Sequence, residues 1–237
     1  MSPARRENPA DKRPWWAPVL VAIVVILIPP TLVLTNVRLL MTPAFLQIEY
    51  RLPGFPDDPY GFTRQDRLRW APIALEYLLN DAGREFLGDL RFDDGSPVYN
   101  ERELRHMDDV KRLAQAALRF WLASLLVIAV SLLLTRGVGA IGVWRALAGG
   151  GQLTLALMLA LALGLAFSFS SVFVGFHRVF FEGDTWLFRY SDTLIRLFPE
   201  RFWRDAFVFI AAATFAEAAG LWTLARCLSR RAATRTG

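Results

Sequence analysis

Two histidines are the residues of this chain best suited to proton transfer. His106 stands about four helical turns before the apolar stretch that begins at Phe120, and His177 follows the apolar stretch that ends at Val174. An imidazole titrates near pH ~6.5, so it can accept or donate a proton at neutral pH. One histidine is equally compatible with a solvated helix face, but two at the ends of apolar stretches indicate a shared role. We therefore predict that His106 and His177 are catalytic.

A metal site is the second interpretation of the same residues. His106 and Asp109 are three residues apart, so a helix would place them on one face. With His177 they would form a set of two histidines and one carboxylate, which can bind a transition metal. The His-x-x-Asp spacing occurs often by chance, and we expect no metal ligand and no cofactor.

Nucleophilic catalysis by a protein side chain finds little support. The chain has no Gly-x-Ser-x-Gly motif, and Ser96, Ser170 and Ser171 stand in no recognisable motif. The one cysteine, Cys227, lies at the end of the last apolar stretch, so we expect neither a disulfide framework nor a thiol nucleophile near the histidines. If the protein is an enzyme, we expect the nucleophile to come from the substrate.

Glu217 lies midway along the last apolar stretch. A carboxylate inside a membrane is costly and is a functional candidate by default. A single acidic residue forms no proton relay, so we interpret Glu217 as a buried hydrogen-bonding group.

His106 lies within a segment, residues 100–119, that has the pattern of a helix start. Asn100 is a favoured N-cap residue, and Glu103 stands three residues later, where its carboxylate can reach back to the cap. Apolar residues then recur at helical spacing: Leu104, Met107, Val110, Ala114 and Ala117. We predict one helix that carries His106 and continues into the membrane.

The composition is that of an integral membrane protein. Hydrophobic residues make up 54% of the 237 residues, and the mean hydropathy is +0.31. Four stretches are long enough to cross a hydrocarbon core of ~30 Å: Trp15–Leu34, Phe120–Thr135 with the helix before it, Leu153–Val174 and Ala206–Leu228. The first has no clear cleavage site after it, so we interpret it as an uncleaved anchor with a kink at Pro29-Pro30.

Arginine and lysine are concentrated, with almost no acid, in both tails and in the segment that starts at Arg136, which places these parts in the cytoplasm. We predict an α-helical integral membrane protein with four transmembrane helices and a small mixed extracytoplasmic cap. The expected boundaries are cytoplasmic tail 1–14, transmembrane helix 15–35, cap 36–100, amphipathic and transmembrane helix 101–135, cytoplasmic loop 136–151, transmembrane helix 152–175, extracytoplasmic loop 176–204, transmembrane helix 205–228 and cytoplasmic tail 229–237. Both histidines then lie on the extracytoplasmic face of the cell membrane.

Within the cap, residues 45–51 are rich in β-formers and predict a short strand. Thr63 and Asp66 predict a capped helix that contains Pro72, and Asp93-Asp94-Gly95 predicts a turn. Small residues between Gly164 and Gly175 predict a face for close helix packing, and the aromatic residues from Phe176 to Tyr190 indicate an interfacial belt or a wall for acyl chains.

Together these motifs resemble the lipoprotein intramolecular transacylases, the Lit family of bacterial membrane proteins, from about Leu40 to Gly220. The residues that carry the resemblance are Gly61-Phe62-Thr63, Glu103-Leu104-x-His106-Met107-x-Asp109-Val110-Lys111, Phe176-His177-x-x-Phe180-Phe181, Trp186, Asp192-x-Leu194-Ile195 and Leu197-Phe198-Pro199-Glu200-x-Phe202-Trp203. Two histidine motifs in this order, each beside a membrane span, are more specific than either alone.

The resemblance implies an acyltransferase that moves the sn-2 acyl chain of a diacylglyceryl lipoprotein to the α-amino group of its N-terminal cysteine, giving the lyso form. It also implies that His106 and His177 are the essential histidines. We assign His106 as the base that takes the amine proton, and the second imidazole as the group that assists the leaving alkoxide. Such a reaction needs no metal and no cofactor.

Two other classes of function remain open from the sequence. One is a metal-dependent membrane hydrolase, which would need a third ligand near both histidines. The other is a non-catalytic membrane scaffold or transporter, in which Glu217 would matter more than the histidines. We expect lipoprotein substrates and membrane lipid as partners and no nucleic acid, since no basic stripe with interleaved aromatic residues is present. The oligomeric state stays open.

Overall fold

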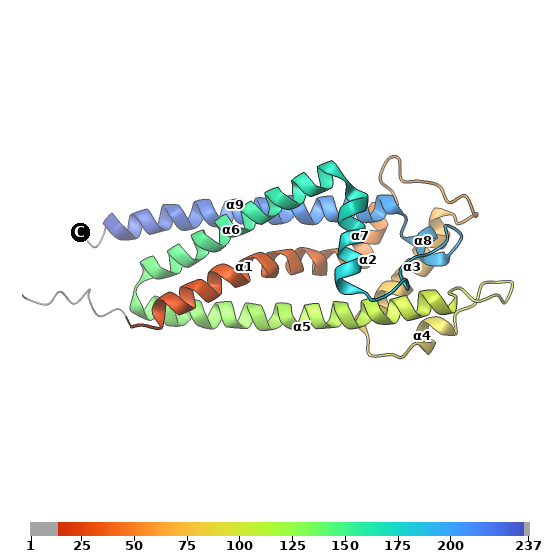
Figure 1. Ribbon diagram of the computed structural model, residues 1–237, viewed down its shortest axis with the longest axis horizontal. Helices are drawn as coiled ribbons and strands as arrows, with labels where there is room; N and C mark the ends of the chain where they lie inside the picture. Colours follow the sequence, from red (N-terminus) through yellow and green to blue (C-terminus); the bar gives the residue numbers. More distant parts are fainter. Residues whose placement is uncertain (1–13, 235–237) are drawn as a thin grey trace, which may run out of the picture. The chain divides into compact units, whose positions relative to one another are not determined.

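The computed structural model describes residues 14–234, so most of the expected tail 1–14 and the last three residues lie outside the described part. The helices in chain order are α1 (Ala17–Leu40), α2 (Pro43–Glu49), α3 (Arg64–Leu79), α4 (Glu85–Gly88), α5 (Glu101–Val138), α6 (Ala140–Phe167), α7 (Phe169–Phe180), α8 (Thr193–Leu197) and α9 (Glu200–Thr234) (Figure 1). Over residues 14–234 there is no strand, only an isolated bridge between Arg91 and Pro97.

Four of the helices are long and apolar enough to cross a membrane: Ala17–Leu40, Glu101–Gly137, Ile141–Phe167 and Glu200–Ala232. This confirms the predicted class of a four-span helical membrane protein. The 38 residues of α5 extend over roughly 57 Å, nearly twice the thickness of the hydrocarbon core. Its charged first half therefore lies outside the membrane-spanning part, which begins near Phe120.

The chain divides into two compact units, and each long helix has residues in both. The first unit contains Met1–Leu32, Leu122–Leu157 and Thr214–Gly237. Its described core is built on Val24, Ile28 and Ala146. Next to it, a side chain at Gly150 would meet Ile28, and one at Gly151 would meet the α9 backbone at Ala218, so these glycines permit close helix packing.

The same glycines explain why the expected loop 136–151 is wrong. The structure is helical there except around Gly139, whose φ of 149° separates α5 from α6. Glycine and arginine indicated a loop, but Ala146 and the three glycines of residues 149–151 belong to a packed helix. The first span is also longer than expected, because α1 continues through Pro29 and Pro30 to Leu40.

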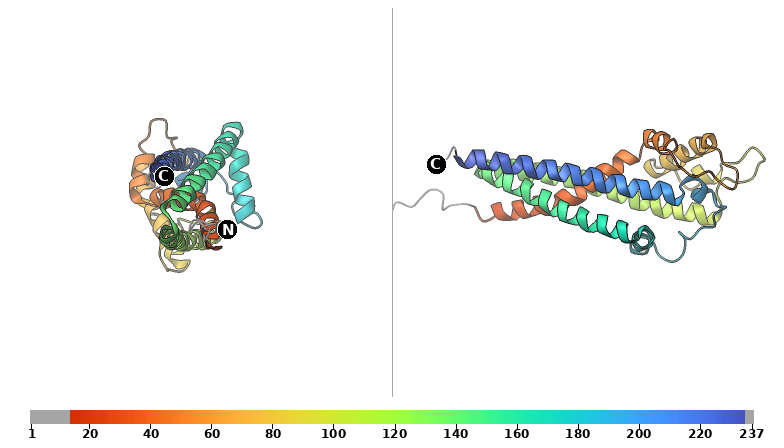
Figure 2. Two further views of the ribbon diagram at one scale, coloured as in Figure 1. Left: turned by 90° about the vertical axis from the view of Figure 1, so that its left-hand side faces the viewer. Right: turned by 90° about the horizontal axis from the view of Figure 1, so that it is seen from above.

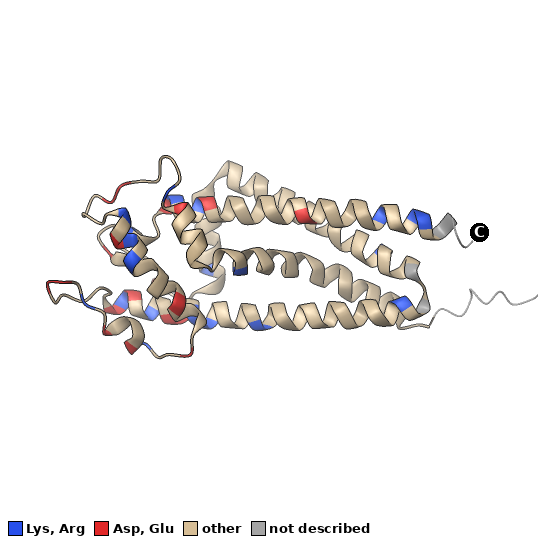
Figure 3. Ribbon diagram, turned by 180° about the vertical axis from the view of Figure 1, so that it is seen from behind, with Lys and Arg blue, Asp and Glu red and all other residues tan. Residues whose placement is uncertain are grey.

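The second unit contains Val33–Trp121 and Met158–Ala213. Its core is formed by buried side chains from six helices and the turn before α5: Leu46, Tyr50, Trp70, Ala71, Ala74, Tyr77, Leu87, Val98, Tyr99, Leu104, Met107, Leu194, Leu197 and Phe202. Acidic and basic residues are interspersed over its short helices and loops and the adjoining helix ends, whereas the middle parts of the long helices carry few charges (Figure 3). This unit is the cap expected from the sequence, together with parts of the long helices.

The strand expected at residues 45–51 is wrong, because α2 occupies this segment. Thr42 is the N-cap of α2, its hydroxyl accepts a hydrogen bond from the N–H of Phe45, and Pro43 follows it. Leu46 and Tyr50 are both buried, at the spacing of one helix face. The start signal at Thr42-Pro43 outweighs the β-forming composition. The capped helix at Thr63 and the turn at residues 92–96 are confirmed.

The single third span expected over residues 152–175 is also wrong. The α6 helix ends at Phe167, and Ser168 takes an extended conformation and caps α7 by accepting from the N–H of Ser171. The α7 helix then runs across the direction of α6 (Figure 1 and Figure 2). The expected small-residue face is therefore divided between two helices.

Candidate active site

His106 and His177 come together in the second unit. His106 lies in the second turn of α5, and His177 lies in the last turn of α7. Their ring centroids are 6.2 Å apart and their planes differ by 20°. Each ring nitrogen lies only about 1 Å from its centroid, so the two imidazoles do not hydrogen-bond directly.

Aromatic side chains enclose the pair. The ring of His106 lies 5.1 Å from Phe181 and 5.2 Å from Phe188. The ring of His177 lies 4.2 Å from Phe173 and 4.9 Å from Trp186. Because only 8% of His106 is exposed, the site is apolar and largely shielded from water.

Burial keeps both imidazoles neutral at physiological pH. It lowers the pKa of His106, which lies outside the membrane-spanning part of α5, from 6.5 to about 4. The nearby His177 adds to this effect and Asp109 opposes it. Burial also lowers the pKa of His177, against a smaller opposing effect of its hydrogen bond to Phe173. A neutral imidazole has a lone pair on one nitrogen, which is the form that can accept a proton.

A hydrogen bond along α7 fixes which nitrogen of His177 has that lone pair. His177 Nδ1 lies 2.8 Å from the carbonyl oxygen of Phe173. A carbonyl oxygen only accepts, so Nδ1 donates its hydrogen and the lone pair of the neutral ring lies on Nε2. In His106, by contrast, Nδ1 is buried and has no hydrogen-bond partner among the described residues.

Two further polar atoms near the pair are also buried without a partner in the described part of the chain. They are the indole nitrogen Nε1 of Trp186, whose ring contacts His177, and Oγ1 of the adjacent Thr185. Buried polar atoms are nearly always hydrogen-bonded, so three such atoms around one site are expected where a bound molecule supplies the missing partners. From the sequence, Trp186 was part of the family motif and of the aromatic stretch, and it gave no signal for this role.

The loop that carries Trp186 and Phe188 is attached to the start of α5. The buried carboxylate of Glu103 accepts from the N–H of Asn100 at 2.8 Å, as expected for a capping box. Its other oxygen accepts from the N–H of Leu194 at 2.7 Å. Arg102 donates to the carbonyl of Leu187 at 2.9 Å, between the two aromatic residues. The sequence predicted the cap but not these contacts with the loop.

The other candidates from the sequence do not join the pair. Over the described residues, no group of three or more His, Cys, Asp or Glu side chains is placed to hold a metal ion, so the proposed metal set is not assembled. Asp109 forms an ion pair with Arg112 instead. Glu217 and Cys227 belong to the first unit, whereas both histidines belong to the second.

The fold and the site define a class: a multi-pass membrane protein with two imidazoles brought together among aromatic side chains. The family model of the lipoprotein intramolecular transacylase, Lit, matches residues 21–203. The chain belongs to this family, and the predicted family, enzyme class and membrane location are confirmed.

Individual relatives agree with this assignment. An uncharacterized protein of Aquifex aeolicus (strain VF5) is 32% identical over 197 residues, which cover 83% of this chain and 88% of the relative. The structure of the membrane-integral lipoprotein intramolecular transacylase Lit from Bacillus cereus matches with a TM-score of 0.76 at 21% identity, covering 93% of this chain and 98% of that one. A variant of the same Bacillus cereus protein matches with a TM-score of 0.70 at 20% identity, over 91% of this chain and 92% of that one. At these identities the two structures show a shared fold.

Proposed function

We propose that this protein transfers an acyl chain within one diacylglyceryl lipoprotein, from the sn-2 glycerol oxygen to the α-amino nitrogen of the N-terminal cysteine, with His106 and His177 as the proton-transfer residues. The observation that carries the proposal is the enclosed pair of neutral imidazoles, 6.2 Å apart. An N–C bond forms, the ester C–O bond breaks, and one proton passes from the amine to the glycerol oxygen. The step balances without a metal, a cofactor or an acyl-enzyme.

The hydrogen bonds favour His177 as the base, which differs from the role that we expected for His106. With Nδ1 held by Phe173, Nε2 of His177 can take the proton of the attacking amine. His106 lies on the other side of the gap and has an uncommitted Nδ1, so it is suited to assist the departing glycerol oxygen. Nucleophile and ester belong to one molecule, so positioning replaces a bimolecular encounter.

Trp186 is suited to stabilise the negative charge that develops on the ester oxygen. Its indole N–H can only donate, it is buried without a partner in the described residues, and its ring lies 4.9 Å from that of His177. A donor that is already in place where charge develops is among the strongest contributions to catalysis. The aromatic walls also limit access of water, which would otherwise hydrolyse the ester.

The outer side of α7 offers a surface for acyl chains and lipid. Phe176, Val179 and Phe180 are exposed large apolar residues, although Phe176 also contacts the ring of His177. Exposed apolar side chains in a membrane protein are suited to contact hydrocarbon. We propose that the acyl chains reach the histidine pair along this face of α7.

We also propose that both termini are cytoplasmic and that the histidine pair lies on the extracytoplasmic face. Support comes from Arg136, Arg226, Arg230 and Arg231, which lie near the ends of α5 and α9, and from the mixed charges of the cap. Diacylglyceryl lipoproteins on the outer leaflet would then be directly accessible to the site.

Mass spectrometry of lipoprotein N-termini tests the function. Cells that lack the gene should accumulate the diacylglyceryl form, and the restored gene should give the N-acylated, monoacylglyceryl form. His106→Ala and His177→Ala should each lose conversion by about 10²–10⁴-fold while the protein still inserts, because general acid–base assistance is typically of this size. Conversion at the parent rate by both variants would refute the assignment of the histidines.

A further inference from the structure

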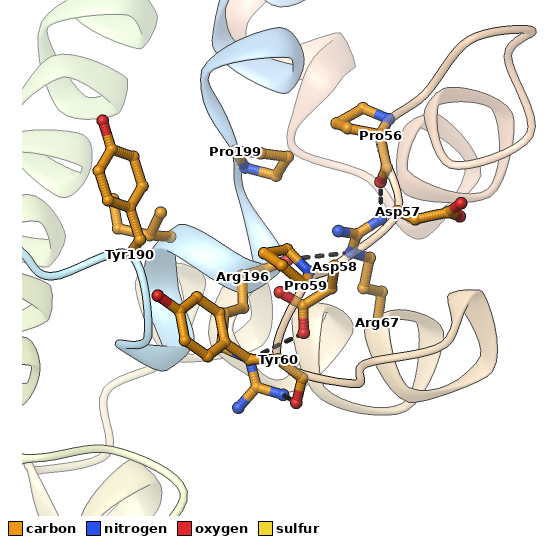
Figure 4. Close-up of a pocket in the computed structure, with 10 residues that line it drawn as sticks. Pro56, Asp57, Asp58, Pro59, Tyr60, Arg67, Tyr190, Arg196 and Pro199 are labelled. Carbon is orange, nitrogen blue, oxygen red and sulfur yellow. Dashed lines mark hydrogen bonds and ion pairs between the residues drawn. The ribbon is translucent and has the colours of Figure 1, made fainter.

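A cavity of about 400 Å³ in the second unit is not used by the proposed acyl transfer. It is lined by residues 56–60 of the loop before α3, by Arg67 of α3, by Tyr190, by Ile195 and Arg196 of α8, and by Pro199 (Figure 4). Its wall therefore combines prolines, two tyrosines and two arginines.

The cavity adjoins the candidate active site along the chain. Phe188 contacts the ring of His106, and Tyr190, two residues later, lines the cavity. Two residues span at most ~7 Å of extended chain. The cavity is therefore on the order of 10–15 Å from the histidine pair, a distance that four or five extended residues cover.

Arg67 has a donor available to a ligand. Its side chain is buried and is held by Nε, which donates to the carbonyl of Arg196 at 2.9 Å, and by Nη1, which donates to the carbonyl of Pro56 at 2.8 Å. Among the described residues, Nη2 makes no hydrogen bond and no carboxylate forms an ion pair with Arg67. In Figure 4 the carboxylate of Asp57 points away from the guanidinium groups.

The second arginine of the cavity is already neutralised. Arg196 forms an ion pair with Asp58 at 2.9 Å and lies 3.5 Å from the ring of Phe62. The cavity therefore presents one rigid arginine donor and little net charge, which suits a neutral acceptor such as a peptide carbonyl.

Tyr60 and Tyr190 supply exposed aromatic surface at the same cavity. They are 51% and 81% exposed, and their hydroxyls make no hydrogen bond among the described residues. Aromatic side chains line many grooves that bind extended peptides, and tyrosine gives contact area at a low entropic cost.

We propose that this cavity binds the polypeptide of the lipoprotein substrate just beyond the acylated cysteine, with a main-chain carbonyl on Nη2 of Arg67 and the peptide against Tyr60 and Tyr190. The proposal rests on the proposed function, because it takes a lipoprotein as the substrate. Recognition of the main chain would allow one enzyme to act on clients of different sequence.

Binding of two probes tests this. One is a fluorescent diacylglyceryl-cysteinyl peptide of about ten residues, and the other is diacylglyceryl-cysteine amide with the same dye. In the parent protein we expect the long probe to bind about tenfold more tightly. A Tyr60→Ala, Tyr190→Ala double variant should bind both probes equally. Arg69→Gln is the control. Arg69 lies on α3, the helix that carries Arg67, but it pairs with Asp93 outside the cavity.

The outcomes separate this inference from the acyl-transfer proposal. Equal affinity of the parent for both probes, or a double variant that keeps the difference, would overturn the inference. If the parent binds the long probe more tightly and the double variant abolishes this difference, the inference is supported, even if no N-acylated product forms. Absence of the product would count only against the proposed chemistry of the histidines. If both probes bind the parent equally and the double variant instead weakens binding of phosphatidylglycerol, the cavity binds a lipid headgroup and the inference is wrong. Arg67→Lys, checked for an unchanged melting temperature, should weaken only the long probe.

Discussion

The carboxylate of Glu103 accepts a 2.7 Å hydrogen bond from the backbone N–H of Leu194, so the residue that caps the helix of His106 also holds the start of α8, which follows the loop whose Phe188 packs on His106. The buried side chain of Glu103 thus connects the N-terminus of α5 with the segment that follows the aromatic loop of the site. Glu103 does not contact the space between the imidazoles and acts as a positioning residue.

We expect Glu103→Gln to lower kcat by about 5–50-fold with little change in KM, because a glutamine can satisfy only one of the two N–H donors. The loop should also become easier to cleave at the exposed Arg189, which limited trypsin proteolysis measures. Glu101→Gln is the matched control, since Glu101 is exposed on the first turn of the same helix. Parent kinetics and parent cleavage in Glu103→Gln would contradict the positioning role.

Trp186→Phe should keep the aromatic contact with His177 but remove the N–H. If this donor stabilises the developing oxyanion, kcat should fall about 10–1,000-fold while KM and the pH profile stay unchanged. Trp222→Phe, which removes a buried indole N–H in the first unit, serves as the control. An active Trp186→Phe protein would assign Trp186 to packing alone.

The lowered pKa values of the histidines predict where activity depends on pH. Burial lowers the pKa of His106 to about 4 and also lowers the pKa of His177, so both rings are protonated, and activity lost, only at a lower pH than for a free imidazole. Above pH 7, kcat/KM should still rise in the range of an α-amino group, about 7.7–8, because the attacking amine must be neutral. A second titration near pH 6.5 would show that the histidines are less buried during the reaction than in this structure.

The orientation can be checked independently of activity. Reporter fusions at Gly237 should be active only in the cytoplasm, and insertions within residues 80–95 only outside it, because of the distribution of arginine and lysine. A cytoplasmic signal from residues 80–95 would move the histidine pair to the wrong side for outer-leaflet lipoproteins.

Glu217→Gln should leave acyl transfer within about twofold of the parent. Glu217 belongs to the first unit and both histidines belong to the second, so we assign it to packing. Glu217 is exposed in the structure and not buried as we expected, so the melting temperature should change by no more than about 2 °C, which thermal unfolding in detergent would measure. Loss of transfer in a well-inserted variant would give Glu217 a functional role.

The sequence predicted those features that depend on local signals or long apolar stretches. The Asn100 cap, the helix through His106, the Thr63 cap and the four membrane-spanning helices follow from residues close together in the chain. The pairing of His106 with His177 was predicted because each stands beside an apolar stretch and because of the resemblance to the Lit family.

Features that depend on contacts between distant residues were not predicted. The apolar composition continues from α6 into α7, so the sequence does not mark Ser168 as a helix break. The break is evident only from the structure, in which Ser168 is the N-cap of α7. The N–H of Trp186 and Oγ1 of Thr185 are unusual only because burial leaves them without partners. The tautomer of His177 required the position of the Phe173 carbonyl, which is why we propose His177 as the base although the sequence had favoured His106.

The break at Ser168 has a consequence for how this protein should be studied. It places His177 on a short helix with no fully buried residue, so the protein itself covers little of that helix. Surrounding lipid must then supply the rest of the support, and the bilayer becomes a structural component of the catalytic centre. Rates measured in short-chain detergent and in membranes of different acyl-chain packing should therefore differ even when the folded protein is the same.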